Sequence, residues 1–192
     1  MGREIRMVPA NWEHPKRTTF DFRLHREVEN YRPMRDECFR VAMREWIAEW
    51  DKWERGERPE YCSDEYKDTA FWEYHGGPPD PEYYRPEWKP EDQTWFQLYE
   101  TVSEGCPVTP PFATKQELAD YLVANGDFWD QKRREEGCSI MPRAPWPREQ
   151  AESFVFGEGF APSIVIANGK VMSGVEFVTQ PTTPQGDNNG MD

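Results

Sequence analysis

The most regular hydrophobic pattern in the chain runs from Asp36 to Arg55. Its apolar positions recur at intervals of three and four residues, which is the spacing of one face of an α-helix. They are Phe39, Met43, Trp46, Trp50 and Trp53, with Ala42 and Ile47 beside them. Pro33 and the acids that follow it suit the start of a helix, and Gly56 suits its end. We therefore predict a helix over 36–55 whose tryptophan face belongs to the core.

Four further segments have the composition of β-strands. Arg3 to Val8 is a short one that Pro9 ends, and Thr94 to Val102 is rich in aromatic residues. The segments 163–167 and 170–172 are separated by Asn-Gly, the dipeptide that a type I′ hairpin turn favours. We predict a small antiparallel sheet from 94–102, 163–167 and 170–178.

Two shorter helices are predicted around these strands. Thr114-Lys115-Gln116-Glu117 has the form of a capping box, and Asn125-Gly126 suits the end of the helix that follows. Pro147 can open a second helix over 147–156. The charged residues 132–136 between them indicate a loop. The predicted fold class is α+β: a small antiparallel β-sheet with helices packed on one face, plus an irregular segment rich in proline and aromatic residues.

That irregular segment spans residues 57–92. Its six prolines prevent long helices and central strands, while its eight aromatic residues argue against a free linker. Eleven acids against four bases give it a charge of −7. We interpret it as an ordered wrap over the preceding helix or as a partner-binding surface. The candidate contact residues are Asp64, Glu65, Asp68, Phe71, Trp72, Glu73 and Tyr74. In the competing interpretation the rings complete the core and the acids form a solvated face.

The chain thus divides into four segments, most of which are expected to form one compact domain. Residues 1–56 hold the first strand and the tryptophan helix, 57–92 the acidic segment, and 93–179 an α+β unit. Residues 180–192 are rich in Pro, Gly, Asn and Thr and predict a flexible tail.

Composition narrows the classes of partner. Hydrophobic residues make up 36% and charged residues 31%, values that suggest disorder, but nine tryptophans contradict it. The net charge of −13 repels nucleic acid phosphates and anionic membranes, so we expect no direct nucleic-acid binding and no membrane association. It fits a protein partner with a basic surface, although acidic charge also serves solubility alone. Cysteines without a CxxC pair and a polar N-terminus suggest a reducing, cytoplasmic location.

Motifs for catalysis or cofactor binding are not found. His14, His25 and His75 stand outside metal-binding patterns, and a site built on Cys62 and His75 would need two further ligands. Cys106 has no neighbouring histidine in the sequence to activate it. We therefore predict no catalytic, cofactor-binding or metal-binding residues, no cofactor and no enzymatic activity.

The C-terminal half resembles a group of small tailed-bacteriophage proteins of unassigned function. The resemblance covers residues 94–178 and lies in the run from Phe96 to Pro110, the capped helix that follows, and Gly159-Phe160-Ala161-Pro162-Ser163. Arg6-Met7-Val8-Pro9 resembles the start of the same proteins. Residues 20–92 depart from the group, some members of which carry a cysteine-rich insert there. Only Cys38 and Cys62 lie in this span of the chain, so a zinc site is not carried over. The resemblance implies a phage origin and the cytoplasm of a bacterial host, but no activity.

Two functional classes follow. The first is a non-enzymatic phage accessory protein that binds and inhibits a host or anti-phage defence protein, with acidic mimicry of nucleic acid as one means. The alternative is a structural or assembly protein of the phage particle, for which the same composition would serve. The oligomeric state is left open.

Overall fold

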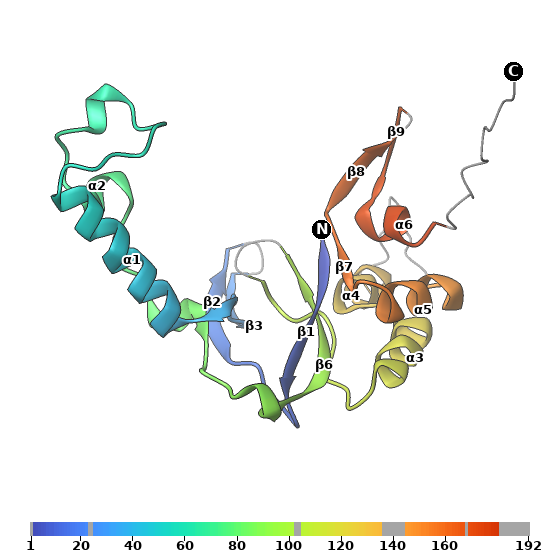
Figure 1. The fold of residues 1–192 in the computed structure, drawn as a ribbon. Coiled ribbons are helices and arrows are strands. Elements are labelled where there is room, and N and C mark those ends of the chain that lie inside the picture. Colours follow the sequence, from blue (N-terminus) through green and yellow to red (C-terminus); the bar gives the residue numbers. More distant parts are fainter. Residues whose placement is uncertain (1, 23–24, 102–104, 136–144, 168, 181–192) are drawn as a thin grey trace, which may run out of the picture. The chain divides into compact units, whose positions relative to one another are not determined.

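The structure of the protein is a computed structural model that describes residues 2–22, 25–101, 105–135, 145–167 and 169–180. Contacts group the chain into two units, each with helices and strands (Figure 1). Unit 1 comprises residues 1–10, 94–102 and 107–192, and unit 2 comprises 11–93 and 103–106. The predicted α+β class is confirmed. Among the described residues, no helix combines the length and the hydrophobicity that crossing a membrane requires.

Unit 1 is built on a three-stranded sheet in the order β6-β1-β7. Its strands are β1 (Arg3–Pro9), β6 (Gln93–Glu100) and β7 (Phe160–Ala161), of which β1 and β7 are antiparallel. The N–H of Thr101 donates to the carbonyl of Gly2, which places the start of β1 beside the end of β6. The predicted strands near both positions are confirmed, but the sheet predicted from 94–102, 163–167 and 170–178 is wrong, because only the first of these segments belongs to it. The central strand is β1, which pairs with β6 and β7. The outer edge of β6 forms isolated bridges to Phe112 and Pro107 and does not pair with the C-terminal hairpin.

The predicted hairpin forms a separate two-stranded sheet of β8 (Ile164–Ala167) and β9 (Lys170–Ser173). Ala167 pairs with Lys170, and Gly169 has the positive φ, 72°, that a type I′ turn requires. Asn168 lies outside the described residues. After Ser173 the chain enters α6 (Gly174–Val178), so the strand predicted to reach residue 178 is wrong beyond 173. The Ser173 hydroxyl accepts the N–H of Glu176 and caps this helix.

Three longer helices complete unit 1: α3 (Lys115–Asn125), α4 (Phe128–Glu135) and α5 (Arg148–Phe156). They lie together beside the sheet in Figure 1. Strands and helices share one core, whose buried members include Leu98, Ala161, Leu118, Leu122, Phe154 and Val155. The helices predicted at 115–124 and 147–156 are confirmed. The loop predicted at 132–136 is wrong over its described part, because α4 continues to Glu135.

The start of α3 is the predicted capping box. The Thr114 hydroxyl accepts the N–H of Glu117 at 3.1 Å, and the Glu117 carboxylate accepts the N–H of Thr114 at 3.0 Å. Gly126 ends the helix with a φ of 71°, a value that favours glycine. Local sequence therefore determines both ends of α3.

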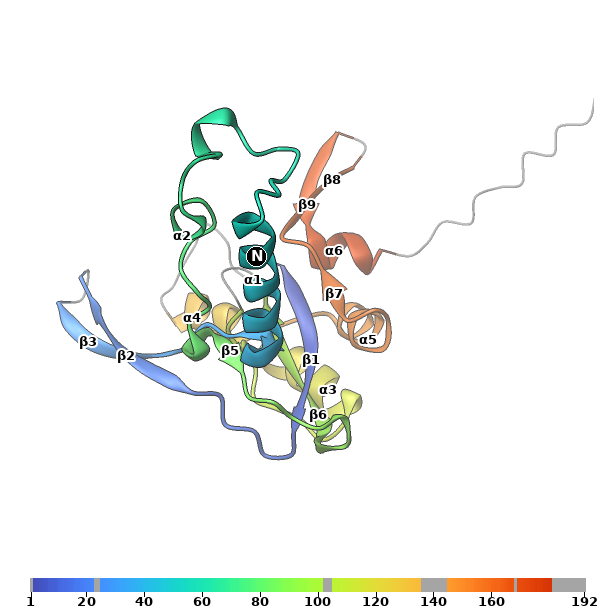
Figure 2. The same cartoon turned by 60° about the vertical axis from the view of Figure 1, so that its left-hand side comes forward.

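Unit 2 contains the helices α1 (Phe39–Glu54) and α2 (Phe71–Tyr74) and two small sheets. One sheet is the antiparallel ribbon of β2 (Lys16–Asp21) and β3 (Arg26–Tyr31), visible in Figure 2, and it was not predicted. The other is the parallel pair of β4 (Arg35–Cys38) and β5 (Tyr84–Arg85). Short 3₁₀ turns follow at η1 (Asp64–Tyr66), η2 (Pro81–Tyr83) and η3 (Pro90–Asp92).

The helix α1 begins at Phe39, later than the predicted start at Asp36. Pairing with β5 holds residues 35–38 extended, and Cys38 has a ψ of 143°. The first turn of the helix consequently contains no acidic residue. Its predicted end is confirmed, because Gly56 follows it with a φ of 83°.

The tryptophan face of α1 is a core face only in part. Trp53 is 5% exposed, and Trp46 is partly buried against the same cluster. Trp50 is 38% exposed, and its indole N–H donates to the carboxylate of Glu54. The prediction that Trp50 is a core residue is wrong, because the segment that covers α1 packs on Trp46 and Trp53. Of the tail predicted over 180–192, all but Gln180 lies outside the described residues.

Candidate functional site

An aromatic cluster joins α1 to the acidic segment of unit 2. Phe71 is 2% exposed, and its ring centroid lies 5.9 Å from that of Trp53. Tyr74 stacks on Trp53 with centroids 4.6 Å apart, and buried Cys62 completes the cluster. Residues 62–74 are thus an ordered wrap over the helix, which is one of the two predicted interpretations.

Polar contacts hold this wrap in place. The indole N–H of Trp53 donates to the carbonyl of Thr69 at 3.0 Å. The Arg58 guanidinium lies over the Trp53 ring at 3.9 Å and donates to the carbonyls of Trp53 and Lys67 at 2.5 and 3.0 Å. Arg58 and Lys67 are the two bases between residues 57 and 74, so half of the positive charge there serves the fold of the segment.

The outside of the wrap exposes rings and carboxylates together. Trp72 is 60% exposed, Tyr61 84% and Tyr66 42%. The exposed acids beside them in the chain are Asp64, Glu65, Asp68 and Glu73. We call these seven residues the acidic aromatic surface. Exposed apolar groups rimmed by polar side chains often mark a site of protein–protein interaction.

The predicted contact residues separate into two groups. Asp64, Glu65, Asp68, Trp72 and Glu73 are exposed on the acidic aromatic surface. Phe71 and Tyr74 pack inward, so they support this surface from beneath. Burial is the main cause that raises the pKa of the Tyr74 hydroxyl, and the nearby Cys62 thiol and Tyr61 raise it further. Asp64 pairs with Lys67 at 2.5 Å, an exposed contact of little energetic weight.

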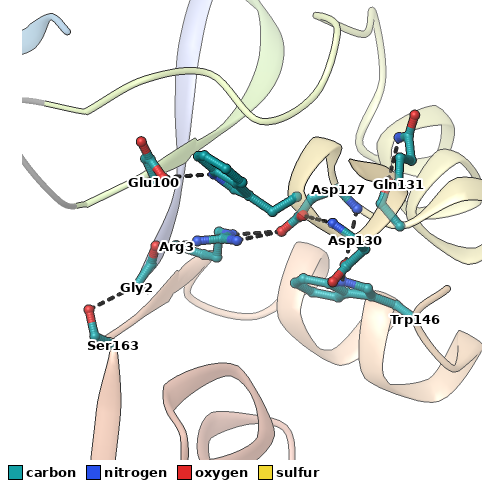
Figure 3. A network of polar contacts seen from close by, with 10 residues as sticks. Gly2, Arg3, Glu100, Asp127, Asp130, Gln131, Trp146 and Ser163 are labelled. Carbon is teal, nitrogen blue, oxygen red and sulfur yellow. Dashed lines mark hydrogen bonds and ion pairs between the residues drawn. The ribbon is translucent and has the colours of Figure 1, made fainter. Parts of the chain in front are cut away.

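A second candidate region is a buried polar network in unit 1 (Figure 3). Arg3, at the start of β1, donates from Nε and Nη2 to Oδ2 of Asp127 at 2.8 and 2.6 Å. The two side chains are 6% and 3% exposed. A buried ion pair of this kind compensates two charges that would each be costly alone.

The same network begins the helix α4. Oδ1 of Asp127 accepts the N–H of Asp130 at 2.9 Å, and Oδ2 of Asp130 accepts the N–H of Asp127 at 3.3 Å. The Trp146 indole N–H also donates to Oδ2 of Asp130, at 3.1 Å. This reciprocal pair resembles a capping box. Asp-x-x-Asp directly after Gly126 is therefore the sequence signal for α4 that our prediction missed.

Glu100, at the end of β6, is the least compensated carboxyl of the network (Figure 3). It accepts the indole N–H of Trp129 at 2.9 Å. Burial raises the pKa of Glu100, and the hydrogen bond from Trp129 and the charge of Arg3 offset this only in part.

A groove of about 760 Å³ lies between this network and the hairpin. Its apolar lining includes Trp146, Ile164, Val171 and Val175. Its polar lining includes Arg3, Asp127, Asp130, Arg133, Gln150, Ser163, Ser173 and Glu176. Sequence patterns did not point to this groove, because its residues come from segments that only the fold brings together.

The described ranges contain no group of three or more His, Cys, Asp or Glu side chains placed to hold a metal ion. Cys62 is buried in the aromatic cluster, while His75 is exposed and stacks on Phe71 at 4.8 Å. The two side chains that the sequence offered as a starting pair therefore serve the packing of unit 2.

Comparisons of the chain with protein-family models, with curated proteins and with solved structures gave no match. The resemblance to small tailed-phage proteins therefore stays a prediction from the sequence.

Proposed function

We propose that the protein is a non-enzymatic binding protein that engages a basic surface of another protein. The observation that carries the proposal is the acidic aromatic surface, in which Trp72 and Tyr61 are exposed on a packed aromatic base. In the phage setting that the resemblance implies, the partner is a host or anti-phage defence protein. Binding inhibits that partner in the cytoplasm of the bacterial host.

The exposed rings supply the affinity in this proposal. Trp and Tyr are the residues most often found as binding hot spots, because a buried ring removes a large apolar area from water. Trp72 lies in the short helix α2, and the preceding residue of that helix, Phe71, is buried in the aromatic cluster. A ring on an ordered backbone loses less entropy on binding than one on a free linker.

The carboxylates supply speed and selectivity. Acids beside the rings attract a basic partner, and the chain's net charge of −13 extends that attraction beyond direct contacts. A basic groove that ordinarily receives nucleic acid would accept such a surface, which makes acidic mimicry the simplest mode of inhibition. Association of this kind weakens as salt screens the charges.

The test is capture of the partner from infected host cells by the tagged full chain, followed by binding measurements with the purified partner. The first variant reverses charge on the proposed surface at Asp64, Glu65, Asp68 and Glu73, each to Lys. A matched control reverses four exposed acids elsewhere, Glu91, Asp92, Glu149 and Glu158, with the same change in net charge. Trp72→Ala tests the anchor.

We expect the first variant to fold normally and to lose capture, while the control keeps most of its affinity. Trp72→Ala should weaken binding by about 2 kcal/mol or more, as hot-spot truncations do. Unchanged rate and affinity in the surface variant at moderate salt would rule the proposal out. Stoichiometric copies of the protein in purified particles would instead favour the assembly role.

A further inference from the structure

The groove of unit 1 has an apolar wall that is exposed in the described part of the chain. Cross-strand pairing places Ile166 opposite Val171 and Ile164 opposite Ser173, so these four side chains share one face of the hairpin. Ile164 is 63% exposed and Val171 69%. Both line the groove, together with Val175 and the Trp146 ring. This wall suits an apolar ligand group.

The polar lining offers hydrogen-bond donors. The Ser163 hydroxyl already accepts the N–H of Gly2 at 2.7 Å, and the Ser173 hydroxyl accepts that of Glu176 at 3.2 Å. The O–H of each serine can therefore donate a hydrogen bond to a ligand. Arg133 and Gln150 make no hydrogen bond or ion pair with the described part of the chain. A partly buried guanidinium that has no partner among the described residues is a binding position for an anion.

The acids of the groove are mostly occupied. Asp127 accepts from Arg3, and Asp130 accepts from Trp146 and from the N–H of Asp127 (Figure 3). Asp130 and the exposed Glu176 contribute the negative charge of the lining that an anionic ligand has to overcome. The groove as a whole therefore combines an apolar wall with unused donors, one of them cationic.

We propose that this groove binds a small apolar monocarboxylic acid, whose carboxylate pairs with Arg133 and whose apolar body lies against Ile164 and Val171. Its volume of about 760 Å³ falls in the range of small-molecule sites, roughly 300–1,000 Å³. The site lies in unit 1 and does not depend on the acidic aromatic surface. A negative result for this ligand site would therefore leave the proposed function standing, and a negative result for the proposed function would leave this site standing.

The experiment titrates the full chain with octanoate by isothermal calorimetry. Octanamide serves as the neutral probe of the same length, and a short peptide with a free C-terminal leucine tests a polypeptide source of the carboxylate. Arg133→Met removes the guanidinium, and Lys132→Met is the matched control, since Lys132 is exposed and does not line the groove. Ile164→Asp places a negative charge on the apolar wall at an exposed position.

We expect octanoate to bind at millimolar concentration or below and octanamide to bind about tenfold more weakly or worse. Arg133→Met should weaken octanoate about tenfold, equivalent to about 1.4 kcal/mol, and Ile164→Asp should abolish binding. Lys132→Met should change affinity by less than about twofold. Equal binding of octanamide, an unaffected Arg133→Met variant, binding of the peptide alone, or no binding of any probe would each overturn the proposal.

Discussion

Two buried carboxyl groups of unit 1, those of Asp127 and Glu100, have different hydrogen-bond donors. Asp127 accepts two N–H donors from the Arg3 guanidinium, whereas Glu100 accepts one neutral indole N–H from Trp129. The charge of Asp127 itself adds to the burial that raises the pKa of Glu100. Glu100 is therefore a group through which this network responds to pH.

Glu100→Gln is predicted to flatten the pH dependence of stability. A carboxyl with a raised pKa binds its proton more tightly in the folded chain than in the unfolded chain. The free energy of unfolding therefore falls as pH rises from the ordinary value of 4.5 through the raised pKa, and recovers as pH falls. The amide can still accept from Trp129, but it does not titrate. Urea unfolding of both chains at several pH values above 4.5 measures the difference.

The matched control for this prediction is Glu158→Gln, at an exposed position. It should leave the slope of stability against pH unchanged. A Glu100→Gln chain that loses stability with rising pH as steeply as the parent would contradict the role assigned to Glu100.

At the scale of elements, one helix carries tryptophans with different roles. Trp53 and the partly buried Trp46 pack against the wrap that follows the helix, while Trp50 remains exposed at the edge. The hydrophobic repeat alone does not distinguish them, because all three lie at helical spacing. Which of them is covered depends on where residues 62–74 return to the helix.

Replacing Trp53 and Trp50 with alanine, one at a time, should change the free energy of unfolding by very different amounts. Trp53→Ala removes a buried ring, its hydrogen bond to Thr69 and the surface on which Arg58 lies, and should cost about 3–5 kcal/mol. Trp50→Ala should stay within about 0.5 kcal/mol of the parent, as at most exposed positions. Chemical denaturation followed by tryptophan fluorescence measures both. A large cost at Trp50 would mean that its ring is buried in solution.

At the scale of the whole molecule, the chain leaves unit 1 after β1 and re-enters it at β6. These strands are neighbours, and the bond between Thr101 and Gly2 makes them antiparallel. Antiparallel neighbours can be joined by a short turn. Residues 11–92 are thus, topologically, an insertion between two strands that a hairpin could connect.

Replacing residues 11–92 with a short glycine-rich turn should therefore leave unit 1 folded. The buried core of unit 1 is formed by residues that follow the replaced segment, among them Leu98, Leu122 and Phe154, and Ile5 of β1 packs against it. Cooperative thermal unfolding and an intact near-UV circular dichroism spectrum are the expected results. A chain with helical far-UV signal but no cooperative transition would show that unit 1 needs the segment to fold.

The elements whose ends depend on contacts between neighbouring residues could be predicted from the sequence. The capping box at Thr114 and Glu117 and the glycines after α1 and α3 act within a few residues, so both ends of α3 and the end of α1 were predictable. The Asn-Gly dipeptide likewise predicted the pairing of β8 with β9. The α+β class followed from the same signals. The acidic, aromatic character of residues 57–92 was likewise visible, because composition needs no fold.

Only the tertiary structure decided which elements meet. It placed β1 at the centre of the sheet, kept residues 35–38 extended by pairing them with β5, and turned Phe71 inward while Trp72 faces outward. It also brought Arg3 to Asp127 and Arg133 to the hairpin, and so created the groove. These outcomes depend on contacts between residues far apart in the chain, whose free energy no local pattern records.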